Sequence, residues 1–348
     1  MSTSESTSWH DNIQSLQVDM TSYCNAKCGG CARNRNGHDI TPGVVLEHFN
    51  LDIWNRLAIE DTKGIHIKEL VINGNWGDGM MHPYLADMIA TFAEYHPETS
   101  LYLHTNGSMR SAKFWKQLAT TCRQFSNHMV VFSLDGLEDT HSIYRRNTDF
   151  GKVVQNIKSF TEERGRANVT MTLFEHNKHQ VAEVRALAKS LDASVFTLRH
   201  SFGDNLQIIA PGENYMIHAC NEIPEERSEL HNKHRLSDIK NHMEHLDFAD
   251  TIPEVETECP WLADRMVQID PWGTVWPCCH ISYHGTDVIL EHTGEEATDE
   301  NFVEARQMNN LKHTPLYTIL SNRWYADVLP DAVAGEKWVV CQEQCFTD

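Results

Sequence analysis

The sequence lacks several features that would fix the class of the protein at once. It has no run of about 18 apolar residues, so we expect no helix that spans a membrane. Its first residues hold neither the basic start nor the apolar stretch of a secretory signal, so we expect a cytoplasmic protein. Positive charge is scarce, since 29 Lys and Arg stand against 49 Asp and Glu, a net charge of −20. Without a dense basic block, a nucleic acid is not an expected partner.

The composition is that of a globular protein, with 41% hydrophobic and 22% charged side chains among 348 residues. From residue 16 to about 202, strand-like segments rich in Val, Ile and Leu alternate with amphipathic helical segments. This alternation predicts a parallel sheet with helices outside it. Six such units predict an α/β fold, a partial (β/α)6 TIM-like barrel that is open rather than closed by eight strands.

The pattern changes twice further along the chain. Residues 203–258 are rich in His, Glu and Asn, with only short apolar groups, which favours a helical connector on the surface. Residues 259–348 hold five cysteines, a predicted hairpin over 265–278 and a helix, so we expect a small, cysteine-rich α+β domain there. The predicted domains are therefore 1–202, 203–258 and 259–348.

Ten cysteines without an export signal indicate metal ligands or redox chemistry rather than disulfides. Three of them, Cys24, Cys28 and Cys31, form a CX3CX2C loop after the first predicted strand. Thiolates select zinc or iron–sulfur clusters. A structural zinc ion needs four ligands, so zinc would require a fourth from elsewhere in the fold. On a cluster of four irons, three thiolates leave one iron open to another molecule.

The cysteine loop and the strand ends around it resemble the radical S-adenosylmethionine (SAM) superfamily. In that family the three cysteines hold a [4Fe–4S] cluster, and its open iron binds SAM. The resemblance implies that Asp135 binds the SAM ribose and that Arg145 binds its carboxylate. The full set of implied SAM contacts comprises Trp76, Gly77 and Asp78 after the second strand, Asn106 after the third, Ser133, Asp135 and Arg145 at the fourth, and Leu198 in the sixth.

Two positions depart from the family pattern. The family's Gly-Gly-Glu segment is Trp76-Gly77-Asp78 here, which implies a shorter reach or an added water at the acid. The residue before the third cysteine is often aromatic in the family and stacks near the adenine, but here it is Gly30. We therefore expect another side chain, such as that of Trp76, to cover the adenine.

The C-terminal part resembles the auxiliary-cluster extensions called SPASM and twitch domains. Its Gly273-X4-Cys278 spacing matches their pattern, and four cysteines fit the shorter twitch form with one auxiliary [4Fe–4S] cluster. Zinc is the alternative metal for four thiolates. The implied ligands are Cys259, Cys278, Cys341 and Cys345. Cys279 is then the spare cysteine, and either Cys279 or His280 is a candidate redox or proton-transfer group, with simple packing as the alternative.

The resemblance implies an enzyme that cleaves SAM reductively to a 5′-deoxyadenosyl radical, which abstracts a hydrogen atom from the substrate. We expect an oxidoreductase that dehydrogenates a small molecule, with a flavodoxin- or ferredoxin-type protein as electron donor. One alternative is a maturase that crosslinks, epimerises or forms a thioether in a ribosomal peptide. Another, of a different class, is a non-catalytic zinc or iron–sulfur binding protein. Arg199 follows the sixth strand and faces the expected substrate mouth, where substrate binding and a plain salt bridge are both open.

Overall fold

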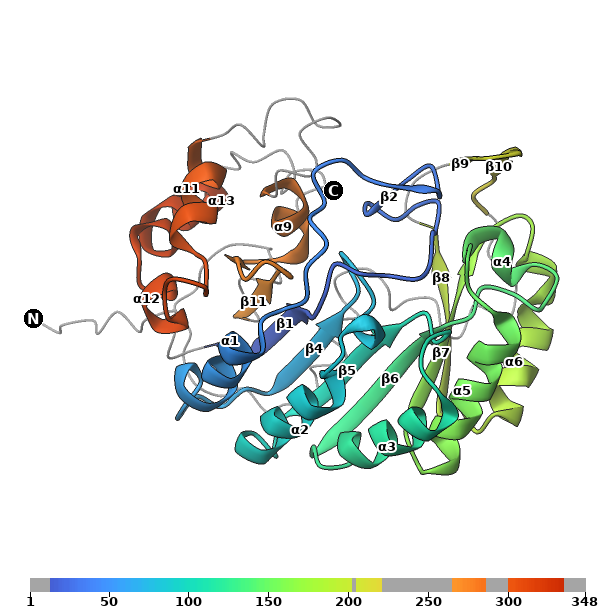
Figure 1. The fold of residues 1–348 in the computed structure, drawn as a ribbon, viewed down its shortest axis with the longest axis horizontal. Helices are drawn as coiled ribbons and strands as arrows, with labels where there is room; N and C mark the ends of the chain where they lie inside the picture. The colour runs from blue at the N-terminus through green and yellow to red at the C-terminus, as the bar shows by residue number, and fades with distance from the viewer. Residues whose placement is uncertain (1–12, 202–204, 221–264, 286–299, 335–348) are drawn as a thin grey trace, which may run out of the picture.

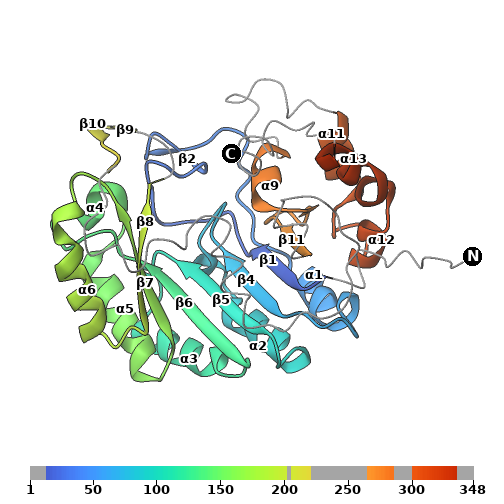
Figure 2. The same ribbon diagram turned by 180° about the vertical axis from the view of Figure 1, so that it is seen from behind.

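The computed structural model describes residues 13–201, 205–220, 265–285 and 300–334. Its centre is one eight-stranded sheet with the strand order β12-β11-β1-β4-β5-β6-β7-β8. Figures 1 and 2 show this sheet as a curved, open surface with helices along one side. The strands that matter most for the site are β1 (Ser15–Asp19), β4 (Glu69–Asn73), β5 (Ser100–Thr105), β6 (Asn127–Ser133), β7 (Ala167–Leu173) and β8 (Val195–His200).

These six strands are parallel neighbours, and each overlaps a segment that the sequence predicts as a strand. The α/β fold with a partial barrel is thereby confirmed. Each strand alternates between two faces, because successive side chains of a strand point to opposite sides. In β5, Leu101 and Leu103 are fully buried toward the helices, whereas the alternate residues Tyr102 and His104 face the inner side of the curved sheet.

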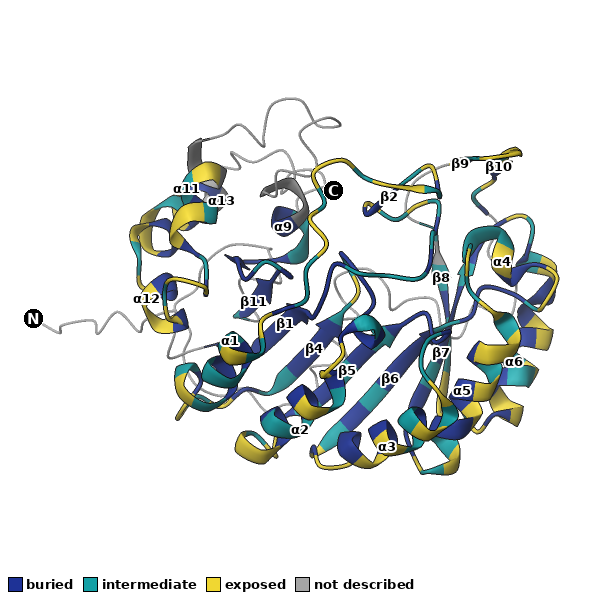
Figure 3. Ribbon diagram, in the orientation of Figure 1, coloured by how far each residue is buried: buried dark blue, intermediate teal, exposed yellow. Residues whose placement is uncertain are grey.

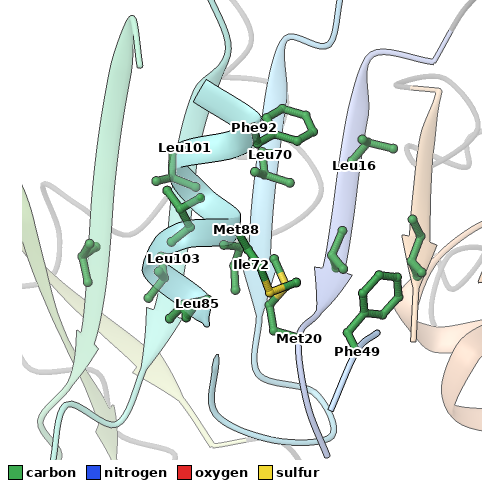
Figure 4. Close-up of a cluster of buried hydrophobic side chains, with 14 of the residues drawn as sticks. Leu16, Met20, Phe49, Leu70, Ile72, Leu85, Met88, Phe92, Leu101 and Leu103 are labelled. Atoms are coloured by element: carbon green, nitrogen blue, oxygen red, sulfur yellow. The ribbon is translucent and has the colours of Figure 1, made fainter. Parts of the chain in front are cut away.

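The helices on the outer side are amphipathic and bury one face against the sheet. They are α1 (Leu51–Arg56), which continues as the π-helical turn η2 (Leu57–Asp61), α2 (Leu85–Tyr95), α3 (Ala112–Cys122), α5 (Phe150–Glu162) and α6 (Val181–Ser190). In α2, Leu85, Met88 and Phe92 recur at helical spacing and point at Ile72 and Leu103 of the sheet (Figure 4). Figure 3 shows the opposite faces of these helices exposed. Cys122 is buried in this core, four residues after the buried Leu118 and so on the same face of α3.

The predicted hairpin in the C-terminal part is present as β11 (Met266–Ile269) and β12 (Val275–Trp276), paired antiparallel. Asp270 closes its turn by accepting hydrogen bonds from the amides of Trp272 and Thr274. Strand β11 also pairs in parallel with β1, from Ser15 opposite Met266 onward. The C-terminal part therefore continues the barrel sheet rather than forming a sheet of its own. Its helical elements are α9 (Cys279–Gly285), α11 (Glu300–Met308), α12 (Leu316–Leu320), η9 (Trp324–Val328) and α13 (Leu329–Ala334).

The connector that the sequence predicts as helical over 203–258 is different where the structure describes it. Residues 206–217 form an antiparallel hairpin of β9 (Leu206–Ala210) and β10 (Glu213–Ile217). Pro211 and Gly212 turn the chain between the strands, and Gly212 has φ +78°, a conformation that favours glycine. Residues 221–258 lie outside the described residues.

Among the described helices, none combines the length and the apolar character that crossing a membrane requires.

Candidate active site

The predicted site residues gather at the carboxyl ends of the parallel strands. The cysteine loop follows β1, Trp76–Asp78 follow β4, Asn106 follows β5, and Asp135 follows β6. Parallel strands bring these ends to one edge of the sheet, where ligands of such folds bind. Hydrogen bonds between the loops, described below, show that the loops themselves are in contact.

Gly77 lies against the backbone that leads into the cysteine loop. A Cβ atom at Gly77 would be 2.2 Å from the carbonyl oxygen of Thr21 and 2.6 Å from that of Tyr23. Next to it, the amide of Asp78 donates to the Tyr23 carbonyl at 2.9 Å. Only glycine permits this approach, so the loop after β4 fixes the start of the cysteine loop.

The Asp78 carboxylate is buried and joins the loops after β4 and β5. It accepts hydrogen bonds from the hydroxyl of Thr105 at 3.0 Å and from the amide of Asn106 at 2.7 Å. The amide of Met80 also donates to it, at 3.0 Å. Burial raises the pKa of Asp78, and these hydrogen bonds work against that rise. Three donors leave about one acceptor position on the carboxylate, which is enough for a single further donor such as an ammonium group.

Asn106 connects this network to the first cysteine. Its Nδ2 lies 3.8 Å from the Sγ of Cys24 and 2.9 Å from the Oδ1 of Asn25, to which it donates. The Oδ1 of Asn106 accepts from the amide and hydroxyl of Ser108, which fixes the orientation of the side-chain amide. An N–H group is therefore aimed at Cys24.

Arg145 makes the corresponding contact with the second cysteine. Its Nη1 lies 3.7 Å from the Sγ of Cys28, and its Nε is 2.5 Å from the Oδ2 of the fully buried Asp135. The other oxygen of Asp135 accepts from the amide of Thr172 on β7. Burial alone would lower the pKa of Arg145, but Asp135 and Cys28 raise it, so the guanidinium stays charged.

The donor set around the loop fits an iron–sulfur cluster. Burial raises the pKa of all three thiols, that of Cys28 to about 11, so holding them as thiolates requires positive charge from a metal. N–H groups from Asn106 and Arg145 face two of the sulfurs, a contact that tunes iron–sulfur clusters. In the described ranges no group of three His, Cys, Asp or Glu surrounds a point fit for one metal ion. A four-iron cluster binds its three thiolates at separate corners and so does not need such a point.

The remaining predicted contacts are placed as follows. Trp76 is fully buried, with its ring centroid 5.4 Å from that of Trp272 in the C-terminal hairpin. Ser133 ends β6 opposite Thr170 of β7, close to Asp135 in sequence. Leu198 belongs to the main hydrophobic core and is 8% exposed, and its contact with SAM stays a prediction.

Two residues that the sequence analysis missed pack against the glycines of the cysteine loop. Ile208 of β9 lies 2.4 Å from a Cβ built on Gly29, and Leu206 lies 3.1 Å from one built on Gly30. The amide of Ile209 donates to the Asn36 carbonyl, which ties the hairpin to the loop near the upper edge in Figure 1. The Pro211-Gly212 pair between alternating apolar residues was the available signal for this hairpin.

The C-terminal candidates are partly described. Cys278 is buried, and its Sγ accepts from the amide of Ile281 at 3.4 Å. Cys279 is half-buried at the start of α9, and burial followed by the nearby Asp19 carboxylate raises its pKa to about 12. His280 is also half-buried. Three of the four implied auxiliary ligands, Cys259, Cys341 and Cys345, lie outside the described residues.

No protein-family model matches the chain, and no curated protein sequence does. Solved structures are similar, however. SuiB of Streptococcus suis has a TM-score of 0.58 at 13% identity, covering 93% of this chain and 68% of SuiB. SuiB bound to precursor peptide SuiA has a TM-score of 0.51 at 13% identity, over 91% and 67%. Native anSMEcpe with bound AdoMet, which is SAM, and Cp18Cys peptide has a TM-score of 0.54 at 14% identity, over 96% and 88%.

These similar proteins are radical SAM enzymes. The chain has the radical SAM fold. The resemblance drawn from the cysteine spacing is thereby confirmed at the level of the fold, across more than nine-tenths of the chain. At 13–14% identity, the roles of single residues rest on the contacts in this structure, not on the likeness.

Proposed function

We propose that this protein is a radical SAM enzyme that cleaves SAM reductively and removes a hydrogen atom from its substrate. The observation that carries the proposal is the convergence of the CX3CX2C loop with Asp78, Asn106 and the Asp135–Arg145 pair at one sheet edge. With its electron from a flavodoxin- or ferredoxin-type donor, a [4Fe–4S] cluster at Cys24, Cys28 and Cys31 supplies the reduction that breaks SAM into methionine and a 5′-deoxyadenosyl radical.

The chain's own residues have positioning roles in this proposal. Asn106 and Arg145 donate toward the sulfurs of Cys24 and Cys28 and so orient the thiolates. Asp78 keeps one acceptor position for the SAM ammonium, and Arg145 can pair with the SAM carboxylate while Asp135 holds its guanidinium in place. Trp76, Gly77, Ser133 and Leu198 complete the proposed SAM contacts. The buried Asp78, Asn106 and Asp135 keep water from their side of the site, which protects a carbon radical there.

The finer parts of the proposal concern the substrate and the second cluster. We propose that the reaction is dehydrogenation of a small molecule. An auxiliary [4Fe–4S] cluster held by Cys259, Cys278, Cys341 and Cys345 would accept the second electron from the substrate. His280 would take up the substrate proton, and Cys279, which its raised pKa keeps as a neutral thiol, is the redox candidate beside it. A peptide is the second candidate substrate, since SuiB and anSMEcpe, the similar structures, are each described with a bound peptide. Transfer of deuterium from labelled candidates into 5′-deoxyadenosine distinguishes the two.

The proposal is tested by SAM cleavage in anaerobically reconstituted protein reduced with dithionite. We expect 5′-deoxyadenosine from the wild type and none from a variant in which Cys24, Cys28 and Cys31 are all Ala. Cys122→Ala, which removes a buried thiol from the helix α3, is the matched control and should keep the activity. Absence of 5′-deoxyadenosine from the wild type, despite bound iron, would favour a non-catalytic binding protein instead.

A further inference from the structure

The last residues of β8 present a cation to the inner side of the sheet. Phe196 packs under the guanidinium of Arg185 from the outer helix α6, at 5.5 Å, and Leu198 lies in the core. Thr197, between them, donates instead to Asn168 of β7 across the inner face. Strand alternation therefore places Arg199 on the inner face with Thr197, and the register sets it opposite Thr172.

Arg199 has no partner in the part of the chain that the structure describes. No carboxylate there lies within ion-pair distance of its guanidinium, and no hydrogen bond to it is formed. Other arginines differ, since Arg145 is paired with Asp135 and Arg146 with Glu213. The plain salt bridge that the sequence left open for Arg199 is thus absent within these ranges.

The charges nearest to Arg199 do not neutralise it. They are Arg145, which has the same sign, and Asp135, whose oxygens are already occupied by Arg145 and the Thr172 amide. His104 faces the same space from β5, where burial and Arg199 lower its pKa to about 4, so it is neutral. A half-buried guanidinium without a counter-ion is costly, and an incoming anion would offset that cost. Positive charge therefore exceeds negative charge around Arg199, although the chain as a whole carries −20.

We infer that Arg199 binds an anionic group of the substrate, a carboxylate or a phosphate held by the guanidinium fork. The inference rests on the proposed function, because it takes the inner face beside the Asp135–Arg145 pair as the substrate site. It narrows the substrate to a small molecule or peptide that presents an oxyanion some distance from the carbon that reacts. It also makes Arg199 a residue that determines specificity rather than one that holds SAM.

The test uses two simple probes, inorganic phosphate and acetate, with neutral acetamide as the uncharged counterpart of acetate. Anaerobically reconstituted full-length protein is titrated at constant ionic strength, and dissociation constants come from the rise in Tm with probe concentration. We expect a saturable rise with at least one anion and none with acetamide. Arg199→Gln should weaken anion binding by about tenfold or more, and Arg199→Lys should keep part of it. Arg323→Gln removes a 67% exposed arginine and should leave binding unchanged.

Three outcomes would overturn the inference: no saturable anion effect in the wild type, equal binding by Arg199→Gln, or competition between SAM and the anion. The last would assign Arg199 to the cofactor. Cleavage of SAM by the wild type is measured separately and reports on the proposed function. A wild type that cleaves SAM but binds no anion contradicts only this inference, whereas one that binds anions without cleaving SAM contradicts the proposed function.

Discussion

Arg145 reaches the sulfur of Cys28 although 117 residues separate them in the chain, with 3.7 Å between Nη1 and Sγ. Because the same guanidinium is paired with Asp135, the carboxyl end of β6 is joined directly to the loop that follows β1. The geometry of the cysteine loop therefore depends on a salt bridge formed elsewhere in the barrel.

Removing this arginine should destabilise the protein strongly. Arg145→Met leaves the fully buried Asp135 carboxylate without its cation, which we expect to lower the free energy of unfolding by about 3–5 kcal/mol. Urea denaturation measures the change. In the double variant Asp135→Asn/Arg145→Met the unpaired charge is gone, so part of the loss should return. Equal stability of the single and double variants would show that the ion pair contributes little.

The contact of Gly77 with the backbone of residues 21–23 should not tolerate a methyl group. Gly77→Ala would place Cβ 2.2 Å from a carbonyl oxygen, so the loops must separate, at a cost of about 1–3 kcal/mol. We also expect a lower iron content after reconstitution, because the start of the cysteine loop moves. Gly151→Ala, near the start of α5 with no contact closer than 3.4 Å, is the control and should be neutral or slightly stabilising. Normal iron content in Gly77→Ala would contradict this role.

The glycine before the third cysteine should be coupled to the hairpin β9–β10. Gly30→Tyr introduces the aromatic type of residue common in the superfamily that the loop resembles, but its Cβ would lie 3.1 Å from the Leu206 side chain. We expect the single variant to lose about 1–3 kcal/mol and to melt at a lower temperature. Leu206→Ala in the same chain should recover part of that loss, which a double-mutant cycle measures. Simple additivity of the two substitutions would refute the coupling.

Asp19 should make a contribution to stability that falls as the pH rises toward neutrality. Burial, then the nearby Asp270, raises the pKa of this carboxyl from 3.8 to about 7, against hydrogen bonds from Asn75. The folded state thus keeps a proton on Asp19 that the unfolded state loses, and between about pH 4 and pH 7 the contribution of this carboxyl to folding becomes less favourable as pH increases. At about 1.4 kcal/mol per pKa unit, the decrease amounts to at most about 4 kcal/mol.

Asp19→Asn should remove this contribution, so the Tm of the variant relative to that of the wild type should rise between pH 4 and pH 8, which melting curves can record. A turn of the Gln268 side-chain amide brings its Oε1, a buried atom with no hydrogen-bond partner among the described residues, to the new amide as an acceptor, so we expect the variant to fold. Asp39→Asn, at a carboxylate that is 77% exposed, is the control and should leave the curve unchanged. A difference in Tm between Asp19→Asn and the wild type that stays constant from pH 4 to pH 8 would contradict the raised pKa.

The parts of the fold that the sequence predicted are those with local signals. The alternation of apolar and polar side chains in segments such as 100–105 is a property of neighbouring residues, and the cysteine spacing lies within one loop. Both can therefore be recognised without knowing which distant residues are in contact. The pairing of β11 with β1 and the packing of Leu206 against Gly30 depend on residues far apart in sequence. The partners of Asp78 and Asp135 were missed for the same reason, because a carboxylate's hydrogen-bond donors come from other strands.

The pairing of β1 with β11 has a consequence for synthesis of the chain. Asp19 and Gln268 are hydrogen-bonded although 249 residues separate them in the chain. Strand β1 therefore cannot pair with β11 until most of the polypeptide has left the ribosome. During that interval β1 is an edge strand with unpaired amides and carbonyls, and nascent chains can associate through it. A fragment that stops before β11 would keep the edge of β1 unpaired permanently. We expect such a fragment to aggregate rather than to fold as a stable barrel.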